Sequence, residues 1–270
     1  MSPANNERTI EMMNVQTRRN GAVFEIVLDR PSANTIDGAT SRALSEAFVT
    51  LRDDLSLRVG IVTGAGERFF SAGWDLKSGA VETPDRDWGQ GGFAGLTELF
   101  DIGKPVIAAV NGLAAGGGFE LVLACDLIVA ADHAEFLLPE ARVGVIADAG
   151  GVLRLPRRLP HAIAMEMLLT GRRMSADEAL MRGLINAITP RAEVLTHARQ
   201  LADSICTSAP LAIAAYKEVL LKTENLPVPE AYRVMRSDAC PAYHRLRASE
   251  DFREGPRAFA EKRPPRWRGC

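Results

Sequence analysis

Short apolar runs alternate with amphipathic stretches along the first two thirds of the chain. The runs are rich in Val, Ile and Leu and have the length of buried strands. The expected strands are residues 21–29, 58–63, 105–110, 126–131 and 184–188. Between the first two, Leu44, Phe48 and Leu51 recur at helical spacing, and Asp37 is placed to cap that helix. Strands that alternate with helices predict an α/β fold.

The last third of the chain has a helical pattern throughout. The expected helices are residues 161–171, 192–206, 209–223, 230–246 and 256–263, the first of them ending at Gly171. The stripe of Leu211, Ile213, Val219 and Leu220 is too apolar for a free tail. We therefore expect an α/β core over residues 1–205 and a helical oligomerisation region over residues 206–270.

Composition narrows the class of protein. The 270 residues are 47% hydrophobic and 24% charged, with a net charge of −2. This balance is ordinary for a globular protein, and it argues against a nucleic-acid or anionic membrane surface as the main partner. The polar N-terminus lacks the apolar core of a signal peptide, so we expect a cytoplasmic protein. The four Cys and four His are scattered, which predicts neither a disulfide framework nor a metal site.

The most informative stretch follows the strand at 105–110. Three glycines occupy positions 116–118. An apolar segment begins after them at Phe119, and Glu120 is its second residue. Glycines without a Cβ would let a ligand reach free backbone N–H groups at the start of a helix. Such groups suit a carbonyl oxygen that becomes an oxyanion, with Glu120 in reach as an acid or base. The alternative is a tight turn followed by a favourable first-turn charge.

Three other segments add to this picture. The FSAGWDLK stretch, residues 70–77, could supply a second oxyanion N–H at Trp74, although a plain surface loop has the same composition. Glu140 follows Pro139, which is expected to end a regular element. Residues 79–95 form a long, glycine-rich stretch expected to be a mobile lid or disordered. Residues 64–69 resemble a dinucleotide-binding loop only weakly, because Phe69 takes the third glycine position.

Together these segments resemble the crotonase, or enoyl-CoA hydratase/isomerase, family over nearly the whole chain and in the family's order. The matching stretches are LDRPSANTID, GAGERFFSAGWDLK, KPVIAAVNGLAAGGGFELVLACDLIVAAD, AEFLLPEARVGVIADAGG, LTGRRMSADEALMRGLIN and EGPRAFAEKR. The resemblance implies a spiral of ββα units with a C-terminal helical trimerisation region. It also implies a homotrimer or a dimer of trimers.

The resemblance implies roles for individual residues. Glu120 and Glu140 would be the catalytic acids, and the backbone N–H groups of Trp74 and Gly117 would form the oxyanion hole. Coenzyme A contacts are implied for Arg30, Ala33, Ala72, Asp75 and Leu76, with Lys262 reaching the nucleotide of a neighbouring subunit. Both glutamates are present, which favours hydration or dehydration of an acyl-CoA thioester. The CoA is part of the substrate, so no cofactor or metal is implied.

One departure bears on the substrate. Many hydratases of the family carry glycine and proline where this chain has Ala147 and Asp148. Within the family, SAGWDL, GGFAGLTE, ADAGGVLRLP and TGRRMSADEAL are most similar to members that act on carnitine-derived thioesters. An acidic Asp148, with Trp74, Trp88 and Phe93 nearby, could accept a trimethylammonium group. Core packing or lid anchoring for the aromatics, and a turn or helix cap for Asp148, are the alternatives.

Three functions remain open at this stage. The first is a hydratase or dehydratase acting on an α,β-unsaturated or 3-hydroxy acyl-CoA, either with a carnitine-derived acyl group or as a general enoyl-CoA hydratase of fatty acid oxidation. The second is a double-bond isomerase on the same scaffold, and the third is a non-catalytic trimer that binds acyl-CoA.

Overall fold

The computed structural model describes residues 9–76 and 87–270. The larger of its sheets is seven-stranded and is formed, in spatial order, by β1 (Thr9–Met12), β2 (Val15–Asn20), β3 (Val23–Leu28), β5 (Val59–Gly64), β8 (Val106–Val110), β10 (Leu127–Ala131) and β13 (Ala187–Thr189). The β1–β2–β3 ladder is antiparallel, and the pairs from β3 to β13 are parallel. Every residue of β5 and β8 is buried, as their continuous apolar sequence predicts.

A second sheet completes each turn of the spiral. It contains β12 (Met174–Ser175), β11 (Glu135–Leu137), β9 (Leu113–Ala115) and β6 (Phe69–Ser71) in that order, and β4 (Thr35–Ile36) pairs separately with β7 (Gly73–Trp74). Each pass of the chain contributes a strand to the larger sheet and then one to the smaller, as in β5–β6, β8–β9 and β10–β11. The α/β fold class is confirmed, and with it the expected spiral of ββα units.

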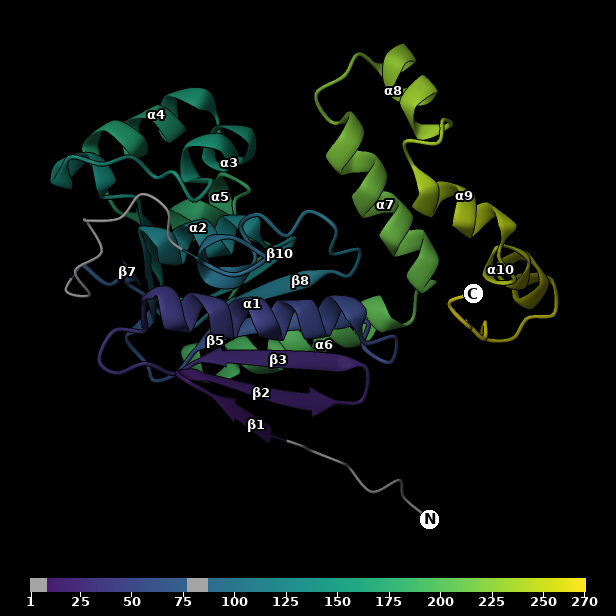
Figure 1. The fold of residues 1–270 in the computed structure, drawn as a ribbon, viewed down its shortest axis with the longest axis horizontal. Coiled ribbons are helices and arrows are strands. Elements are labelled where there is room, and N and C mark those ends of the chain that lie inside the picture. The colour runs from purple at the N-terminus through teal and green to yellow at the C-terminus, as the bar shows by residue number, and fades with distance from the viewer. Residues whose placement is uncertain (1–8, 77–86) are drawn as a thin grey trace.

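The helices of the core cover these sheets (Figure 1). They are α1 (Gly38–Asp53), α2 (Gly117–Ala124), α3 (Gly151–Arg158), α4 (His161–Thr170), α5 (Ala176–Met181) and α6 (Val194–Cys206), with short 3-10 turns η2 (Phe93–Gly95), η3 (Glu140–Val143) and η4 (Arg191–Glu193). Asp37 caps α1 as predicted, accepting a hydrogen bond from the Thr40 N–H at 2.8 Å. Gly171 ends α4 in the left-handed conformation, also as predicted.

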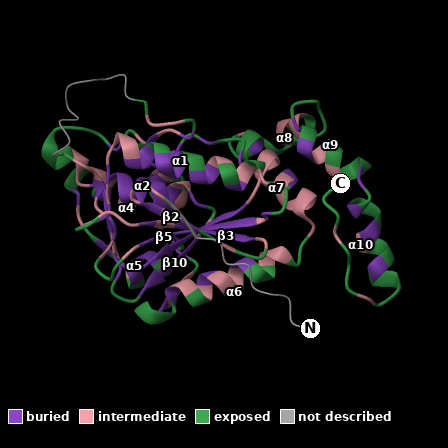
Figure 2. Cartoon of the chain, turned by 60° about the horizontal axis from the view of Figure 1, so that its bottom comes forward, coloured by how far each residue is buried: buried purple, intermediate pink, exposed green. Residues whose placement is uncertain are grey.

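After α6 the chain leaves the core and forms what we call the C-terminal arm, residues 207–270. Its helices are α7 (Pro210–Thr223), α8 (Val228–Met235), α9 (Pro241–Ala248) and α10 (Asp251–Ala260), which lie beside the core rather than over it (Figure 1). Figure 2 shows buried central strands and a far more exposed arm. The arm is joined to the core by the Lys217–Asp126 ion pair at 2.6 Å and by α7 packing at Gly103.

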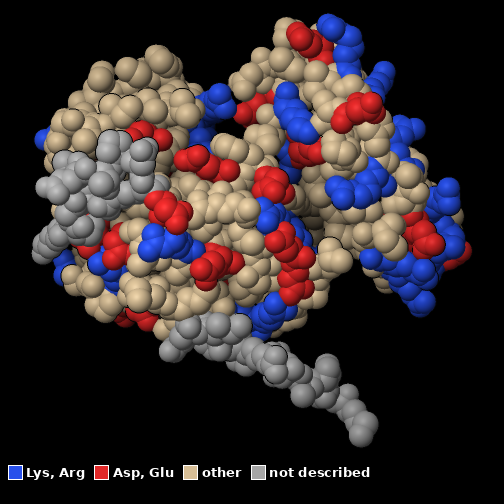
Figure 3. All heavy atoms as spheres, viewed as in Figure 1, with Lys and Arg blue, Asp and Glu red and all other residues tan. Residues whose placement is uncertain are grey.

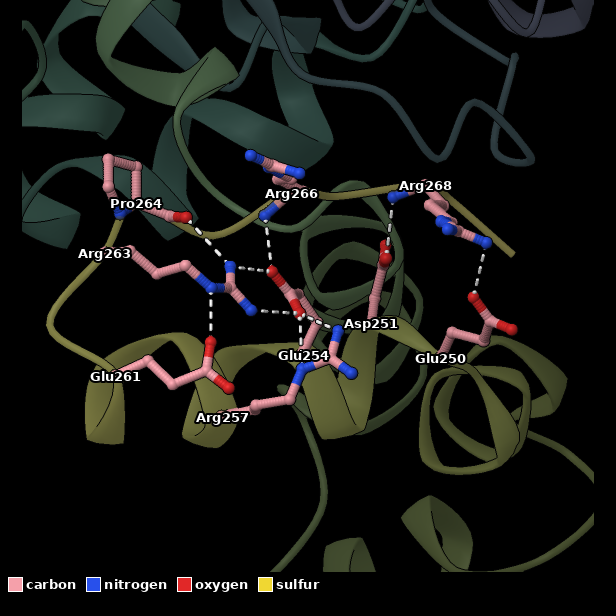
Figure 4. Close-up of polar contacts among 9 residues, drawn as sticks. All are labelled: Glu250, Asp251, Glu254, Arg257, Glu261, Arg263, Pro264, Arg266 and Arg268. Carbon is pink, nitrogen blue, oxygen red and sulfur yellow. Dashed lines mark hydrogen bonds and ion pairs between the residues drawn. The ribbon is translucent and has the colours of Figure 1, made fainter.

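The end of the arm is fastened by carboxylates in the first turn of α10 (Figure 4). Glu254 is 5% exposed and binds the guanidinium groups of Arg257 and Arg263, and it also accepts the Arg266 N–H at 2.8 Å. Asp251 accepts the N–H groups of Arg268 and Gly269. The last residues of the chain are therefore held against α10 rather than left loose.

Several predicted boundaries are wrong for local physical reasons. The helix expected at 230–246 is two helices, because Pro241 lacks an N–H and begins α9 instead of continuing α8. The last helix starts at Asp251, where acidic residues favour a helix N-terminus, and Pro256 lies inside it. Part of the expected 70–77 loop forms β6 and β7. The strand expected at 184–188 lies instead at 187–189, and the hairpin of β1 and β2 has no counterpart in the predicted strands.

No single helix in the described ranges is long and apolar enough to cross a membrane. The bent helix pair Arg191–Cys206 and Pro210–Thr223 has the length and apolar composition of a membrane span, and nothing else about it indicates one.

Candidate active site

The glycine run lies where β9 turns into α2, and its neighbours explain why side chains are excluded there. A Cβ on Gly117 would lie 2.3 Å from the Phe93 ring, and one on Gly118 would lie 2.3 Å from the Ser71 carbonyl oxygen. Gly116 adopts φ 53°, and a Cβ there would lie 2.9 Å from Glu140 Oε1. The glycines are therefore required by the protein's own packing as well as by any ligand. In the first turn of α2, the N–H groups of Phe119 and Glu120 donate to the Gly116 carbonyl at 2.8 and 3.0 Å, whereas Gly117 lies ahead of the first intrahelical bonds.

The predicted second donor lies on the strand next to this helix end. β7 pairs with β4 in the register Ile36↔Trp74. A Cβ on Gly73, which has φ +80°, would lie only 2.6 Å from the Gly117 nitrogen. The fold thus brings the backbone of the Gly73–Trp74 strand against the start of α2. The indole Nε1 of Trp74 is buried and has no hydrogen-bond partner among the described residues.

Glu120 lies within the first turn of α2 and is only 3% exposed. Its Oε1 accepts a hydrogen bond from the Gly151 N–H, in the first turn of α3, at 2.8 Å. The pKa of Glu120 is raised to about 7, mainly by burial and also by the charges of Glu140 and Asp148, which together outweigh the opposing effects of the Gly151 hydrogen bond and Arg154. A carboxyl in this state can give or take a proton near neutral pH.

Glu140 approaches the same place from another element. It is the first residue of η3, directly after Pro139, in agreement with the predicted break in regular structure. Its Oε1 lies near Gly116, and its Oε2 is buried without a hydrogen-bond partner in the described structure. Burial raises the pKa of Glu140, and the charge of Asp148 adds to this effect. Two carboxyl groups with raised proton affinity therefore lie at the N-terminus of α2.

Asp148 lies in the loop between η3 and α3 and is exposed. Its backbone N–H donates to the Ile146 carbonyl at 2.9 Å, and Gly150, rather than Asp148, is the N-cap of α3. The helix-cap alternative is therefore wrong. Because the Asp148 charge acts on both Glu120 and Glu140, its carboxylate belongs to the same electrostatic environment.

The aromatic residues predicted for the acyl pocket form one packed pair. The Trp88 and Phe93 rings meet edge to face with centroids 5.2 Å apart, and Phe93 lies against Gly117. Ser41 Oγ donates to the Trp88 carbonyl, and the Gly91 N–H donates to Ser45 Oγ, so residues 88–95 are anchored on α1. Residues 79–86 of the predicted lid lie outside the described residues. Phe93 is a wall of the site, and Trp88 packs against it.

Residues predicted to contact coenzyme A gather along the pairing of β4 with β7. Ala72 N–H donates to the Ala33 carbonyl at 2.9 Å, and the Arg30 guanidinium pairs with Asp75 at 2.7 Å. Leu76, at the end of this segment, is 58% exposed. Arg30 is therefore not a free surface cation, since its charge is also countered by Asp37 at 3.1 Å. Its guanidinium holds this edge together, and its contact with CoA stays a prediction.

Lys262 is not brought to these residues within one chain. It follows α10, and this helix lies on the far side of α7 from α2 (Figure 1). Lys and Arg side chains gather on this part of the surface in Figure 3. A role at the nucleotide of a neighbouring subunit stays a prediction.

Two features of the site were not anticipated from the residue pattern. One is the Gly151 N–H that binds Glu120, and the other is Arg154, one turn further along α3. The Gly-Gly pair at 150–151 was the available signal, because it marks the start of a helix. In the ranges 9–76 and 87–270, no group of three or more His, Cys, Asp or Glu side chains is arranged to hold a metal ion.

Comparison with known proteins agrees with this architecture. The family model described as enoyl-CoA hydratase/isomerase matches residues 18–270. Carnitinyl-CoA dehydratase of Proteus mirabilis is 60% identical over 250 residues, which cover 92% of this chain and 96% of that protein. Carnitinyl-CoA dehydratase of Salmonella paratyphi A is 59% identical over 252 residues, covering 93% and 97%.

Solved structures show the same fold. The crystal structure of enoyl-CoA hydratase from Mycobacterium tuberculosis superimposes with a TM-score of 0.86 at 39% identity, covering 95% of this chain and 99% of that one. That of enoyl-CoA hydratase from Bacillus anthracis gives 0.86 at 33% identity, covering 96% and 100%. On this extent of similarity, the chain belongs to the enoyl-CoA hydratase/isomerase family.

Proposed function

We propose that the protein is a hydro-lyase that adds water to an α,β-unsaturated acyl-CoA thioester and removes it from the 3-hydroxy form. The observation that carries the proposal is a pair of carboxyls with raised pKa at the N-terminus of α2: Glu120, which is buried, and Glu140, which is half-buried with its Oε2 buried. Hydration must remove a proton from water and deliver one to C2, and two carboxyls can divide these transfers.

The backbone supplies the electrostatic part of the mechanism. Addition of water places negative charge on the thioester oxygen as C3 bonds to the water oxygen. The N–H groups of Trp74 and Gly117 would donate to this oxygen, from strands and helix ends held rigidly together. Removal of one such donor costs about 3 kcal/mol in known acyl-transfer sites.

The proton steps follow from the two carboxyl environments. In hydration, ionised Glu120 takes a proton from water while the water oxygen attacks C3. Protonated Glu140 gives a proton to C2. Dehydration reverses both transfers. A Glu120 pKa of about 7 lets that group act as base in one direction and as acid in the other near neutral pH. Only protons and water are exchanged, so the proposed chemistry needs no cofactor beyond the CoA of the substrate.

For the acyl group, we favour the carnitine-derived pair crotonobetainyl-CoA and carnitinyl-CoA. Support comes from the two relatives named carnitinyl-CoA dehydratase, at 59–60% identity, and from the acidic Asp148 beside the glutamates. The alternative is a general enoyl-CoA hydratase, the name carried by the similar proteins of known crystal structure. The test is kcat/KM of the wild type for crotonobetainyl-CoA and for crotonyl-CoA. Preference for crotonyl-CoA would reject the carnitine assignment.

Including a 3-enoyl-CoA in the same assay separates the other two functions. An isomerase would move the double bond of a 3-enoyl-CoA without adding water, and a non-catalytic binder would leave every thioester unchanged. Retention of both Glu120 and Glu140 favours hydration, because an isomerase would rely on fewer paired acids.

Assembly through the arm is also proposed. Several large apolar side chains of the arm are exposed in the single chain, namely Tyr216, Leu220, Leu221, Val228, Tyr232, Phe252 and Phe259. So much uncovered apolar surface favours burial against further copies of the chain, as a trimer or a dimer of trimers in the cytoplasm. A stable monomer at micromolar concentration in light scattering would contradict this assembly.

A further inference from the structure

A side chain outside the predicted site links the two halves of the catalytic machinery. Arg154 lies in α3, the helix whose first turn binds Glu120 through the Gly151 N–H. Its guanidinium folds back over that turn, so that a Cβ on Gly150 would lie 2.0 Å from Nη1. The positive φ of 109° at Gly150 explains the glycine at the N-cap.

The other end of the guanidinium reaches a different segment. Arg154 Nη2 donates to the Thr97 carbonyl at 2.6 Å, and Thr97 is 1% exposed. Thr97 Oγ1 in turn donates to the Phe93 carbonyl at 2.8 Å. The Phe93 ring lies against Gly117, the proposed oxyanion donor. A continuous set of contacts therefore runs from the helix turn at Glu120 to the wall behind Gly117.

The charge of Arg154 also bears on the site. No carboxylate forms an ion pair with this guanidinium in the described residues, and the like charges that act on it from its own helix are Arg158 and Arg157. Facing Glu120 are Glu140 from η3 and Asp148 from the preceding loop, which both raise the pKa of Glu120, whereas Arg154 lowers it. Burial lowers the pKa of Arg154 itself, yet a guanidinium stays charged in proteins.

We propose that Arg154 is a positioning residue for this reaction: it fixes the α3 turn that holds Glu120 to the segment behind Gly117, and its charge favours ionised Glu120. The inference rests on the proposed function. A packing role alone would require the shape of the side chain but not its charge, and the two can be separated by substitution.

The test uses Arg154→Gln and Arg154→Lys in the full-length protein. Gln keeps an N–H donor without the charge, and Lys keeps the charge without the planar fork. The control is Arg157→Gln, which removes an exposed charge from the same helix. The readouts are kcat and KM for hydration, the pH dependence of kcat/KM, and the Kd of a saturated acyl-CoA.

We expect Arg154→Gln to lower kcat at least about tenfold, because small displacements of positioned groups cost that much or more. We expect the acidic limb of the pH profile of kcat/KM to move to higher pH by at least about 0.5 unit, because a positive charge that favours ionised Glu120 is lost. Arg154→Lys should keep the limb near the wild-type position while kcat still falls. Arg157→Gln should change neither, and the Kd of the saturated thioester should stay within about threefold in all variants.

The charge role would be overturned if the acidic limb of the Arg154→Gln profile lay at the wild-type pH, or if the acidic limbs of the Gln and Lys variants lay at the same pH. Wild-type kcat in both variants would overturn the positioning role. If Arg154→Gln does not fold, the Lys variant still decides, because a limb that moves with the charge retained contradicts the proposal. Wild-type protein that hydrates no thioester in the same assay would reject the proposed function itself, and this inference with it.

Discussion

The Glu120 carboxylate is bound by the Gly151 N–H at 2.8 Å across the gap between two helix N-termini. Both partners lie in first helical turns, where the helix carries partial positive charge. This environment stabilises the ionised carboxylate, while burial destabilises it, and burial prevails. The outcome is an acid that titrates near neutral pH.

Replacement of either glutamate by glutamine tests the proton transfers. Glu120→Gln and Glu140→Gln should each lower kcat at least about a hundredfold, the low end for general acid–base catalysis. The Kd of a saturated acyl-CoA should change little, because glutamine keeps the size of the side chain. Steady-state kinetics and isothermal titration measure the two quantities. Near wild-type turnover in either variant would contradict the mechanism.

The pH dependence should reflect the same residue. Hydration requires ionised Glu120, so kcat/KM for the enoyl-CoA should fall as pH drops below about 7. Dehydration requires protonated Glu120, so kcat/KM for the 3-hydroxyacyl-CoA should fall as pH rises above about the same value. Rates in both directions from pH 5 to pH 9 provide the check. Acidic limbs near pH 4.5 in both directions would exclude this assignment.

The raised pKa of Glu120 also has a cost in stability. The unfolded chain ionises this group near pH 4.5 and the folded chain near 7, so folded wild type loses stability as pH rises between these values. Glu120→Gln does not titrate. It should therefore gain stability over wild type above pH 7, on the order of 3 kcal/mol for a shift of this size, with no gain below pH 4.5. Denaturant unfolding at pH 4.5 and pH 8 measures the difference, and equal stabilities at pH 8 would refute it.

The close contact between Gly117 and the Phe93 ring leaves no room for a larger residue at position 117. Gly117→Ala would place a Cβ 2.3 Å from the Phe93 ring, and overpacking of this kind costs about 1–3 kcal/mol. We expect a lower Tm and a loss of kcat, because the ring and the Gly117 N–H must move apart. The double variant Gly117→Ala with Phe93→Leu should recover part of the Tm. No recovery would show that the ring is not the obstacle.

The strands β5 and β8, helices α1 and α4, and the position of Glu120 behind a glycine run follow from local pattern and cap chemistry. Such signals are short-range. The link between Arg154 and Thr97 spans 57 positions and leaves no periodic trace. The same holds for Arg30, whose partners Asp37 and Asp75 come from separate elements. Pairings of this kind depend on the spiral that brings distant turns together, so charge at single positions could not predict them.

The last prediction concerns the charge of the acyl group. Asp148 is exposed in the loop between η3 and α3, and its charge raises the pKa of both Glu120 and Glu140. A carboxylate in that position can stabilise a fixed trimethylammonium, whereas an uncharged enoyl chain gains nothing from it. We expect wild type to favour crotonobetainyl-CoA over crotonyl-CoA, and Asp148→Asn to lose most of that preference.

The comparison of kcat/KM for the two substrates separates this role from a general electrostatic effect. Loss of the Asp148 charge should lower the pKa of Glu120 and Glu140, which changes the rates with both substrates alike. Only the ratio of the two kcat/KM values, measured on the plateau of each pH profile, reports contact with the cation. Because exposed charge pairs contribute about 0.2–1 kcal/mol and partly buried ones more, the ratio should fall by between about twofold and tenfold. A preference that survives intact in Asp148→Asn would leave the substrate assignment standing and assign recognition of the ammonium group to the aromatic wall, Trp88 and Phe93.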